Sequence, residues 1–376
     1  MKVAVVLWPC SKMGGILTVH TNVVRGLQLL GHEVTDYYLS PNTTRVTPYT
    51  DDTCATLCCE GRSLGIRSRF IKETIAMLQK YDVVIYSHPA PAKNRSFQDE
   101  TWKLLFERLA KQVHQIVLWH DPFWRQYYPW VEDVLCHVEV IGSIQEKAQR
   151  TLPESVLDRA FVCNHPLDLR GMGEHSSTKE NLVILPHQFK SWKKIHLFIA
   201  GVPQIPKKIR VEVYSKGIER YYMAGSLAKR KSRYKKDGKW IWDEAIKAGM
   251  QYLGVVSSEQ IQQAYKRQRC VVDLSVGELG TKKGISYRSI NYAVLECMKY
   301  GGVPVVQFYS VLPPFEEGNF LVVDHNDIVQ STIDCTTQAV LEHGCKRLRE
   351  MRAENRRVLN KHYACQNVVS SLLERI

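Results

Sequence analysis

Short apolar runs alternate with amphipathic segments along most of the chain, and this alternation restricts its fold more than any other feature. The opening run, 2–8, is apolar, and Gly14 and Gly15 follow it. Residues 19–30 then carry apolar side chains at helical spacing up to Gly31, and extended spacing resumes over 33–39. This order predicts a βαβ unit with the two glycines at the carboxyl end of its first strand.

The same alternation continues to the far end of the chain and predicts a parallel sheet covered by helices in each half. Further strands are expected over 82–87, 115–119, 138–141, 161–164, 182–185, 211–214, 254–256, 270–274, 303–308 and 320–323. Further helices are expected over 67–79, 99–112, 193–200, 258–267 and 290–300.

A polar passage over 168–181 interrupts this series and is the predicted linker between two domains. We expect an α/β protein with two doubly wound, Rossmann-like domains, 1–170 and 181–345. A helical segment, 346–376, has leucines on one face and is expected to pack back on the body. The length of 376 residues supports two hydrophobic cores.

Composition excludes several classes of protein. Hydrophobic residues make up 44% and charged residues 24%, which is typical of globular chains and argues against disorder. No apolar stretch is long enough for a membrane helix and no signal peptide is evident, so we expect a cytoplasmic protein with reduced cysteines. The cluster Cys54, Cys58 and Cys59 lacks a following histidine at zinc-finger spacing, so no metal site is predicted.

The charge is strongly positive and unevenly distributed. Lysine and arginine number 51 against 38 acidic residues, a net charge of +13, which favours a polyanionic partner. Residues 207–239 hold twelve basic and three acidic residues with interleaved aromatics. Nucleic-acid binding and a merely solvated basic loop are both compatible with this pattern. The candidate DNA-binding residues are Lys229, Arg230, Lys231, Arg233, Lys235 and Lys236.

Two candidate sites lie in the first half, after predicted strands. The turn containing Gly14, Gly15 and Ile16 lets the backbone approach a diphosphate or sugar, although it matches neither GxGxxG nor a P-loop. His120 and Asp121 follow another strand and form the best candidate catalytic pair, because histidine can exchange a proton near neutral pH. The alternative is that Asp121 caps a helix and His120 packs structurally.

The second half contains candidate phosphate-binding residues. Lys190 and Lys193 lie where a strand gives way to a helix, a suitable place for phosphate, although both lysines could simply be solvated. Residues 284–306 combine a glycine-containing loop, a helix with Glu296 and the run Gly-Gly-Val-Pro. This arrangement can present amides to a diphosphate and a carboxylate to ribose hydroxyls.

The run from Arg288 to Glu296, followed by 301–305, resembles the nucleotide-sugar site of GT-B glycosyltransferases. More narrowly, the chain resembles the DNA α-glucosyltransferases of T-even bacteriophages. Short matching patches occur in order along most of its length, at 14–15, 31–35, 119–121, 192–193 and 288–305.

The resemblance implies a GT-B fold, two Rossmann-like domains facing a central cleft, with an N-terminal acceptor domain and a C-terminal UDP-sugar domain. It implies transfer of a sugar from a UDP-sugar to the hydroxyl of a modified base in duplex DNA, with retention at the anomeric carbon. Glucose and arabinose both stay open as the sugar, and 5-hydroxymethylcytosine is one of the acceptor bases that stay open. The modification would protect phage DNA from host nucleases in the cytoplasm of the infected bacterium. UDP-sugar is the implied co-substrate, and neither an obligatory cofactor nor a metal is implied.

Individual roles follow from the same resemblance. The His120 and Asp121 pair would lie beside sugar and acceptor, Lys193 would bind the diphosphate and Glu296 the ribose. The family's arginine on the diphosphate is replaced by Gln188, with Lys190 a substitute, and a further family glutamate is replaced by Asn291. Base flipping would use aromatic residues for stacking, the candidates being Trp124, Tyr127, Tyr128 and Trp130.

Two other functions compete with this one. A GT-B enzyme acting on a lipid or polysaccharide acceptor would use the basic segment at a membrane surface, but 229–239 lacks a sustained apolar face. A DNA-binding protein that keeps an inactive nucleotide-sugar fold would bind DNA without releasing UDP. We expect a monomer, because no heptad seam is evident.

Overall fold

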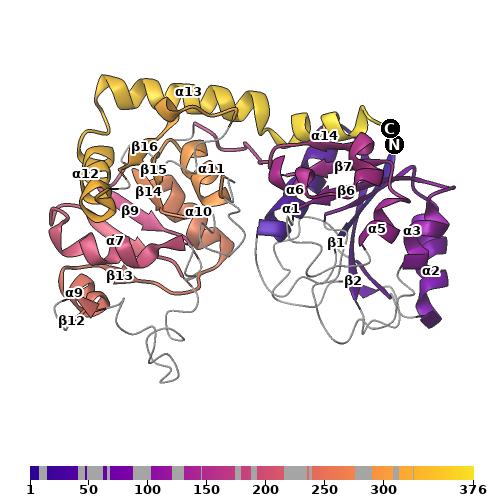
Figure 1. The fold of residues 1–376 in the computed structure, drawn as a ribbon, viewed down its shortest axis with the longest axis horizontal. Helices are drawn as coiled ribbons and strands as arrows, with labels where there is room; N and C mark the ends of the chain where they lie inside the picture. Colours follow the sequence, from indigo (N-terminus) through magenta and orange to yellow (C-terminus); the bar gives the residue numbers. More distant parts are fainter. Residues whose placement is uncertain are drawn as a thin grey trace. The chain divides into compact units, whose positions relative to one another are not determined.

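The computed structural model divides the chain into two compact units (Figure 1). One contains Met1–Asp168 together with Lys361–Ile376, and the other contains Leu169–Asn360. The residues described are 1–7, 15–40, 47–48, 62–65, 68–87, 103–120, 131–144, 146–173, 179–187, 193–215, 235–236, 239–275, 290–307, 313–324 and 326–376. Each unit is an α/β layer structure around its own sheet.

The first unit is built on an eight-stranded sheet. Its strands are β1 (Lys2–Leu7), β2 (Glu33–Ser40), β3 (Thr47–Pro48), β4 (Arg62–Gly65), β5 (Val83–Tyr86), β6 (His114–Trp119), β7 (Val140–Ser143) and β8 (Ala160–Val162). Its helices are α1 (Gly15–Leu29), α2 (Ser68–Leu78), α3 (Lys103–Leu109), α5 (Val131–Leu135), α6 (Glu146–Arg150), the 3-10 helix η3 (Glu154–Arg159) and α14 (Cys365–Leu373).

The strand order is β3-β4-β2-β1-β5-β6-β7-β8, and every pairing except β3 with β4 is parallel. The chain moves outward from β1 to β2 and β4, then crosses back to β5 on the other side of β1. This reversal makes the carboxyl ends of β1 and β5 the topological switch point, where open α/β sheets bind ligands.

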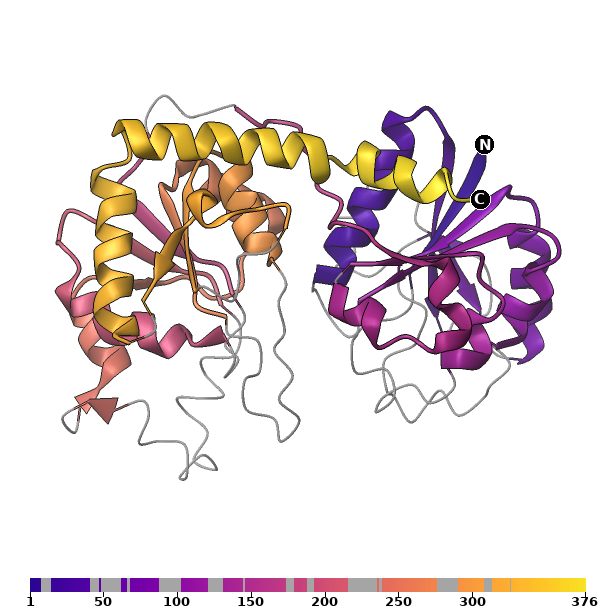
Figure 2. The same cartoon turned by 45° about the horizontal axis from the view of Figure 1, so that its top comes forward.

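Helices cover both faces of this sheet, which explains why its central strands are apolar throughout. Val6, Tyr86 and Trp119 belong to a buried cluster that also contains residues of α2, α3 and α5. The opposite face meets α1, which lies beside α14 (Figures 1 and 2). The C-terminal helix α14 therefore completes the core of the first unit.

The second unit is built on a six-stranded sheet and a separate two-stranded hairpin. The sheet strands are β9 (Leu182–Leu185), β10 (Arg210–Val213), β13 (Gln251–Tyr252), β14 (Cys270–Asp273), β15 (Val303–Gln307) and β16 (Leu321–Val323), and the hairpin pairs β11 (Lys235–Lys236) with β12 (Lys239–Trp240). The helices are α7 (Ile195–Gly201), η5 (Val202–Gln204), α9 (Ile241–Lys247), α10 (Ser258–Arg267), α11 (Tyr292–Lys299), η8 (Glu317–Asn319), α12 (Ile328–Leu341) and α13 (Lys346–His362).

The second sheet is entirely parallel, in the order β13-β10-β9-β14-β15-β16. This is the strand order of the Rossmann fold, and its switch point lies between β9 and β14. One face packs on α7, α9, α12 and α13, and the other packs on α10 and α11. Figure 1 shows α10 and α11 together on one side of this sheet.

Basic side chains bind the carbonyl ends of helices at the amino edge of the second sheet. Lys179 donates to the carbonyls of Gln268 (2.8 Å) and Tyr300, which end α10 and α11. Arg269 donates to Val340 O (2.9 Å) near the end of α12. Cations are stabilising at helix carboxyl ends, so part of the positive charge has a structural role inside this unit. Burial lowers the pKa of Lys179 to about 8.

The sequence pattern located most elements but missed several short ones, among them β4, α5, α6 and α9. Three further differences have physical reasons. The strand predicted over 254–256 is wrong, because Gly254 has φ +66° and Val255 is exposed, while the strand itself is β13. Helix α12 was not predicted, since its isoleucine, valine and threonine residues favour strands. The predicted C-terminal helical segment consists of two helices, and α14 belongs to the first unit.

No helix among the described residues is long and apolar enough to cross a bilayer.

Gly26 lets α1 and α14 approach closely, so we predict that Gly26→Ala lowers the stability of the protein. A Cβ atom at this position would lie 2.6 Å from the backbone oxygen of Cys365. Alanine stabilises an isolated helix by about 1 kcal/mol relative to glycine, but overpacking costs about 1–3 kcal/mol. We therefore expect a net decrease in the free energy of unfolding. The measurement is the midpoint of urea unfolding. Gly344→Ala is the control, because its Cβ would meet no atom within 4 Å. An unchanged or raised midpoint in Gly26→Ala would contradict the packing argument.

Candidate functional site

A polar cluster lies at the switch point of the second sheet. Asp273 is the last residue of β14 and is fully buried. Its carboxylate accepts hydrogen bonds from the backbone N–H of Ser275 (3.0 Å), the Ser275 hydroxyl and the Asn291 amide. A buried carboxylate is costly unless it is hydrogen-bonded and balanced by positive charge, and Asp273 has both.

Lys193 supplies that positive charge through Asn291. Its Nζ donates to Asn291 Oδ1 at 2.8 Å, while the amide nitrogen of the same side chain donates to Asp273. Asn291 is the N-cap residue of α11, yet its side chain makes no capping hydrogen bond. The cluster therefore places an ammonium group next to the N-terminus of α11, and both features favour an anion.

The electrostatics of the cluster keep Asp273 ionised and His187 neutral. Burial alone would raise the pKa of Asp273, but Lys193, His187 and the hydrogen bonds from Ser275 and Asn291 together lower it well below its usual range. His187 is buried 3.7 Å from Asp273 Oδ1, and its Nε2 donates to Val272 O (3.2 Å). Burial lowers the pKa of His187 to about 4, with Lys193 acting in the same direction.

Glu296 lies in the second turn of α11, beyond Asn291. Its side chain is 21% exposed, and Oε2 lies 3.8 Å from Lys299 Nζ. Burial raises the pKa of the neighbouring Tyr265, and the charges of Glu296 and Asp273 raise it further. The charges of Glu296 and Asp273 thus act on the same tyrosine. The hydrogen bonds of the cluster itself join Lys193, Asn291 and Asp273.

His120 lies at the carboxyl edge of the first sheet, directly after β6. Its Nε2 donates to the carbonyl oxygen of Ser87 (2.9 Å), which directly follows β5. Gly15 and Ile16 open α1 after β1, so they start the helix that follows the first strand at this edge. The structure therefore places the two candidate regions of the first unit on the side that its topology favours for ligands.

Several predicted site residues lie outside the described part of the chain. These are Gly14, Asp121, Gln188, Lys190, Arg288, the basic residues Lys229, Arg230, Lys231 and Arg233, the aromatic residues Trp124, Tyr127, Tyr128 and Trp130, and the cysteines Cys54, Cys58 and Cys59. Lys235 and Lys236 form strand β11 of the hairpin. No group of three acidic, histidine or cysteine side chains among the described residues is arranged to hold a metal ion.

Gly301 and Gly302 belong to the run Gly-Gly-Val-Pro, but they do not lie at the edge of the sheet that favours ligands. Both glycines lie between the end of α11 and the start of β15, which is the amino edge of the sheet. Gly301 has φ +71° and ends the helix in a left-handed conformation. A Cβ on Gly302 would lie 2.4 Å from the Gln268 amide. The pair permits a helix end and close packing, and the site lies at the opposite edge.

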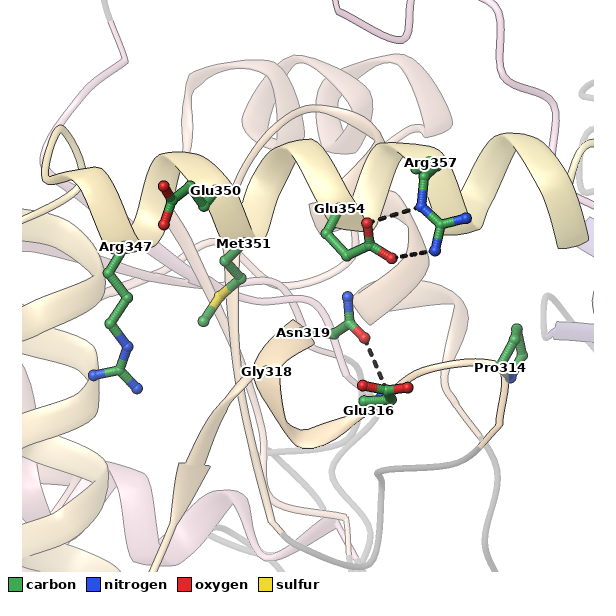
Figure 3. A pocket seen from close by; sticks show the side chains of 9 residues that line it. All are labelled: Pro314, Glu316, Gly318, Asn319, Arg347, Glu350, Met351, Glu354 and Arg357. Carbon is green, nitrogen blue, oxygen red and sulfur yellow. Dashed lines mark hydrogen bonds and ion pairs between the residues drawn. The ribbon is translucent and has the colours of Figure 1, made fainter.

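A pocket of about 410 Å³ lies between α13 and the segment around η8 (Figure 3). It is lined by Pro314, Glu316, Gly318, Asn319, Arg347, Glu350, Met351, Glu354 and Arg357. Glu354 and Arg357 pair with each other across one turn of α13. Because η8 precedes β16, this pocket also lies at the amino end of its strand, away from the cluster.

Sequence reasoning missed three members of the cluster, namely His187, Asp273 and Ser275. A signal was present for Asp273, since it ends the apolar run Cys-Val-Val-Asp just as His120 follows an apolar strand. His187 and Ser275 each lie two residues beyond the end of a strand. Only the pairing of β9 with β14 shows that these positions are neighbours.

Comparison with known proteins identifies the fold. No protein-family model matches the sequence, and no curated protein matches it significantly. An α-glucosyltransferase in complex with UDP-glucose and DNA containing an abasic site is 13% identical, with a TM-score of 0.71 over 100% of this chain and 98% of that chain. An α-glucosyltransferase with UDP and a 13-mer DNA containing a HMU base is 12% identical, with a TM-score of 0.72 over 100% and 99%.

Anabaena Alr3699/HepE in complex with UDP is also similar, with 10% identity and a TM-score of 0.66 over 100% of this chain and 99% of that chain. These likenesses establish that the chain shares the fold of these glycosyltransferases over its full length. The expected GT-B fold with two Rossmann-like units is therefore confirmed.

The lowered pKa of His187 predicts a loss of stability in mild acid. The folded unit keeps the imidazole neutral down to about pH 4, whereas the unfolded chain binds the proton near pH 6.5. Only the unfolded state gains a proton as the pH decreases from 6.5 to about 4, so the stability of the folded state decreases as the pH is lowered across this window. Between pH 7 and 5 this group contributes roughly 2 kcal/mol of that loss. We expect His187→Gln to lose correspondingly less stability than wild type in urea unfolding at the two pH values.

The control for this measurement is His137→Gln, which replaces a partly exposed histidine of the first unit. It should retain the wild-type loss between pH 7 and 5. Equal pH dependence in His187→Gln and wild type would show that His187 is not buried as a neutral group.

Proposed function

We propose that this chain is a UDP-sugar-dependent glycosyltransferase that modifies duplex DNA. It transfers glucose or arabinose to the hydroxyl of a modified base such as 5-hydroxymethylcytosine, with retention at the anomeric carbon. The proposal also includes a monomeric enzyme in the cytoplasm of an infected bacterium, where the modification protects phage DNA from host nucleases. In this proposal the N-terminal domain, 1–170, binds the acceptor DNA, and the C-terminal domain, 181–345, binds the UDP-sugar donor.

The observation that carries the proposal is the Lys193, Asn291 and Asp273 cluster at the switch point of the second sheet. An ammonium group has three N–H donors, so Lys193 can bind a phosphate oxygen while it keeps its bond to Asn291. The N-terminus of α11 adds backbone amides at the same edge. A UDP diphosphate fits this chemistry, and the fold is shared with proteins whose structures contain UDP.

The change from a family glutamate to Asn291 is compatible with this assignment. Asn291 hydrogen-bonds the Asp273 carboxylate, so a negative charge is still present beside Lys193. Asp273 holds the amide with its oxygen toward Lys193, which fixes the position of the ammonium group. Glu296, one turn further along α11, is the proposed ribose ligand.

The proposed chemical step uses His120 and Asp121 in the first unit. Because the Ser87 carbonyl only accepts, the hydrogen of a neutral His120 ring is on Nε2 and the lone pair is on Nδ1. Nδ1 is thus the atom that would exchange a proton with a substrate hydroxyl. DNA as acceptor is supported by the net charge of +13 and by the fold shared with an α-glucosyltransferase solved with DNA.

Transfer to a polysaccharide or lipid acceptor is the second candidate function. The fold is also shared with Anabaena HepE, which has been solved with UDP and glucose, so the fold alone does not single out DNA as the acceptor. Both candidates use the same donor site, and the acceptor distinguishes them.

Lys193→Met should weaken UDP binding by roughly 10- to 100-fold, because a charge-assisted hydrogen bond contributes about 1.5–3 kcal/mol. The measurement is the Kd of UDP by titration calorimetry on folded protein. Lys208→Met removes an exposed lysine of the same unit and should retain the wild-type Kd. If the two variants bind UDP equally well, the diphosphate does not contact Lys193.

A panel assay tests the reaction itself. Duplex DNA containing cytosine, 5-hydroxymethylcytosine or 5-hydroxymethyluracil is incubated with UDP-sugars, and UDP release is measured alongside mass spectrometry of the digested nucleosides. We expect a sugar adduct on one hydroxylated base. His120→Ala and Asp121→Ala should lower its formation roughly 10²- to 10⁴-fold.

The matched control is His114→Ala, which removes an exposed histidine from the opposite end of β6. It should retain wild-type turnover. UDP release without a DNA adduct would transfer the assignment to a polysaccharide or lipid acceptor. DNA binding without any UDP release would identify a binding protein that keeps the fold only.

A further inference from the structure

A chain of buried polar side chains connects three elements of the first unit. His20 on α1 lies between Asp36 on β2 and Ser87 after β5, with Nε2 2.5 Å from Asp36 Oδ1 and Nδ1 2.7 Å from Ser87 Oγ. The exposed fraction is 0% for His20, 1% for Asp36 and 0% for Ser87. The three groups therefore interact without competing solvent.

The hydrogen-bonding capacity of each group fixes the direction of these bonds. The Asp36 carboxylate can only accept, so His20 Nε2 carries a hydrogen and donates to it. In a neutral imidazole the other nitrogen then accepts, so the Ser87 hydroxyl donates to His20 Nδ1. The hydrogen bond to His20 thus holds the Ser87 hydroxyl in one orientation.

The same residue holds His120 from its main chain. The Ser87 carbonyl accepts the Nε2–H of His120 at 2.9 Å. The series from Asp36 through His20 and Ser87 therefore ends on the ring that the proposed reaction uses. Each link joins two different elements: His20 is in α1, Asp36 is in β2, Ser87 directly follows β5 and His120 directly follows β6.

The arrangement contains a serine, a histidine and an aspartate, but it does not fit a nucleophile. Ser87 is completely buried, so no substrate carbonyl can reach its hydroxyl. The arrangement is also costly as a stabilising device. A charged aspartate in the core carries a large desolvation penalty, and Asp36 Oδ2 has no hydrogen-bond partner among the described residues.

We propose that Asp36, His20 and Ser87 are positioning residues for His120. By fixing the Ser87 hydroxyl they fix the backbone of Ser87, and with it the carbonyl that keeps the His120 hydrogen on Nε2 and the lone pair on Nδ1. This proposal rests on the proposed function for the chemical role of His120. The geometry that it asserts can be measured without any substrate.

The first test is the tautomer of His120 in the full-length wild-type protein. Nitrogen-15 NMR of labelled histidines reports which ring nitrogen is protonated, and the signals of His120 and His20 are assigned among the thirteen histidines by comparison with His120→Gln and His20→Gln. We expect both rings to carry the hydrogen on Nε2. Protonation of His120 on Nδ1, or an even mixture, overturns the proposal whether or not the enzyme is active.

The second test removes the link between the buried pair and His120. Ser87→Ala deletes the hydroxyl and keeps the carbonyl, so the backbone at position 87 is held less firmly while the direct acceptor remains. We expect a mixture of His120 tautomers and a kcat lower by roughly 10-fold with the KM for UDP-sugar unchanged, because misplacing a catalytic group lowers turnover rather than donor binding.

Tyr86→Phe is the matched control. Tyr86 is also buried, precedes Ser87 in the sequence and donates a hydrogen bond to Gln115 Oε1 (2.9 Å), outside the His20 series. It should lose stability comparably and keep the wild-type tautomer and kcat. If Ser87→Ala matches Tyr86→Phe in both readouts, the series is structural only and the proposal is overturned. If wild type is inactive but shows the expected tautomers that Ser87→Ala disturbs, the proposed reaction fails and the positioning network stands.

Discussion

Parallel pairing between strands that are distant in the sequence is the constraint on which both units depend. Parallel strands end at a common edge, so the residue after each strand meets those after its neighbours. In the first unit this brings Ser87 beside His120, and in the second it brings His187 beside Asp273. Helices return antiparallel to the strands, so their carboxyl ends gather at the opposite edge.

This polarity separates the charges of the second unit. At the amino edge, Lys179 and Arg269 bind the carbonyl groups that end three helices. At the carboxyl edge, Lys193 lies beside a helix N-terminus and is balanced by Asp273 through Asn291. Lys179 and Arg269 therefore form hydrogen bonds within the fold, whereas Lys193 lies at the edge where an anionic ligand can bind. A net charge counted from the sequence does not distinguish these two uses.

The two units hold their polar groups in related ways. Each places a buried aspartate behind a side chain that reaches the carboxyl edge, Asp36 behind His20 and Asp273 behind Asn291. A carboxylate can accept hydrogen bonds but cannot donate them, so the group that contacts it must turn a donor toward it, and this fixes the orientation of that group. Such groups cost desolvation energy, and their use at both switch points is consistent with a requirement for fixed geometry rather than for stability.

The sequence by itself determined the alternation of strands and helices, because burial of both sheet faces imposes apolar runs and helical periodicity locally. It also predicted that His120 follows a strand and that Lys193 lies near the start of a helix, and the structure has both at these boundaries. It could not identify His20 and Asp36 as partners, because their contact is set by packing of α1 on the sheet. Helix α12 and the true position of β13 were decided by tertiary packing over local propensity. The assembly of His187, Asp273 and Asn291 into one cluster likewise required the β9 and β14 pairing, a contact between residues that local sequence patterns cannot relate.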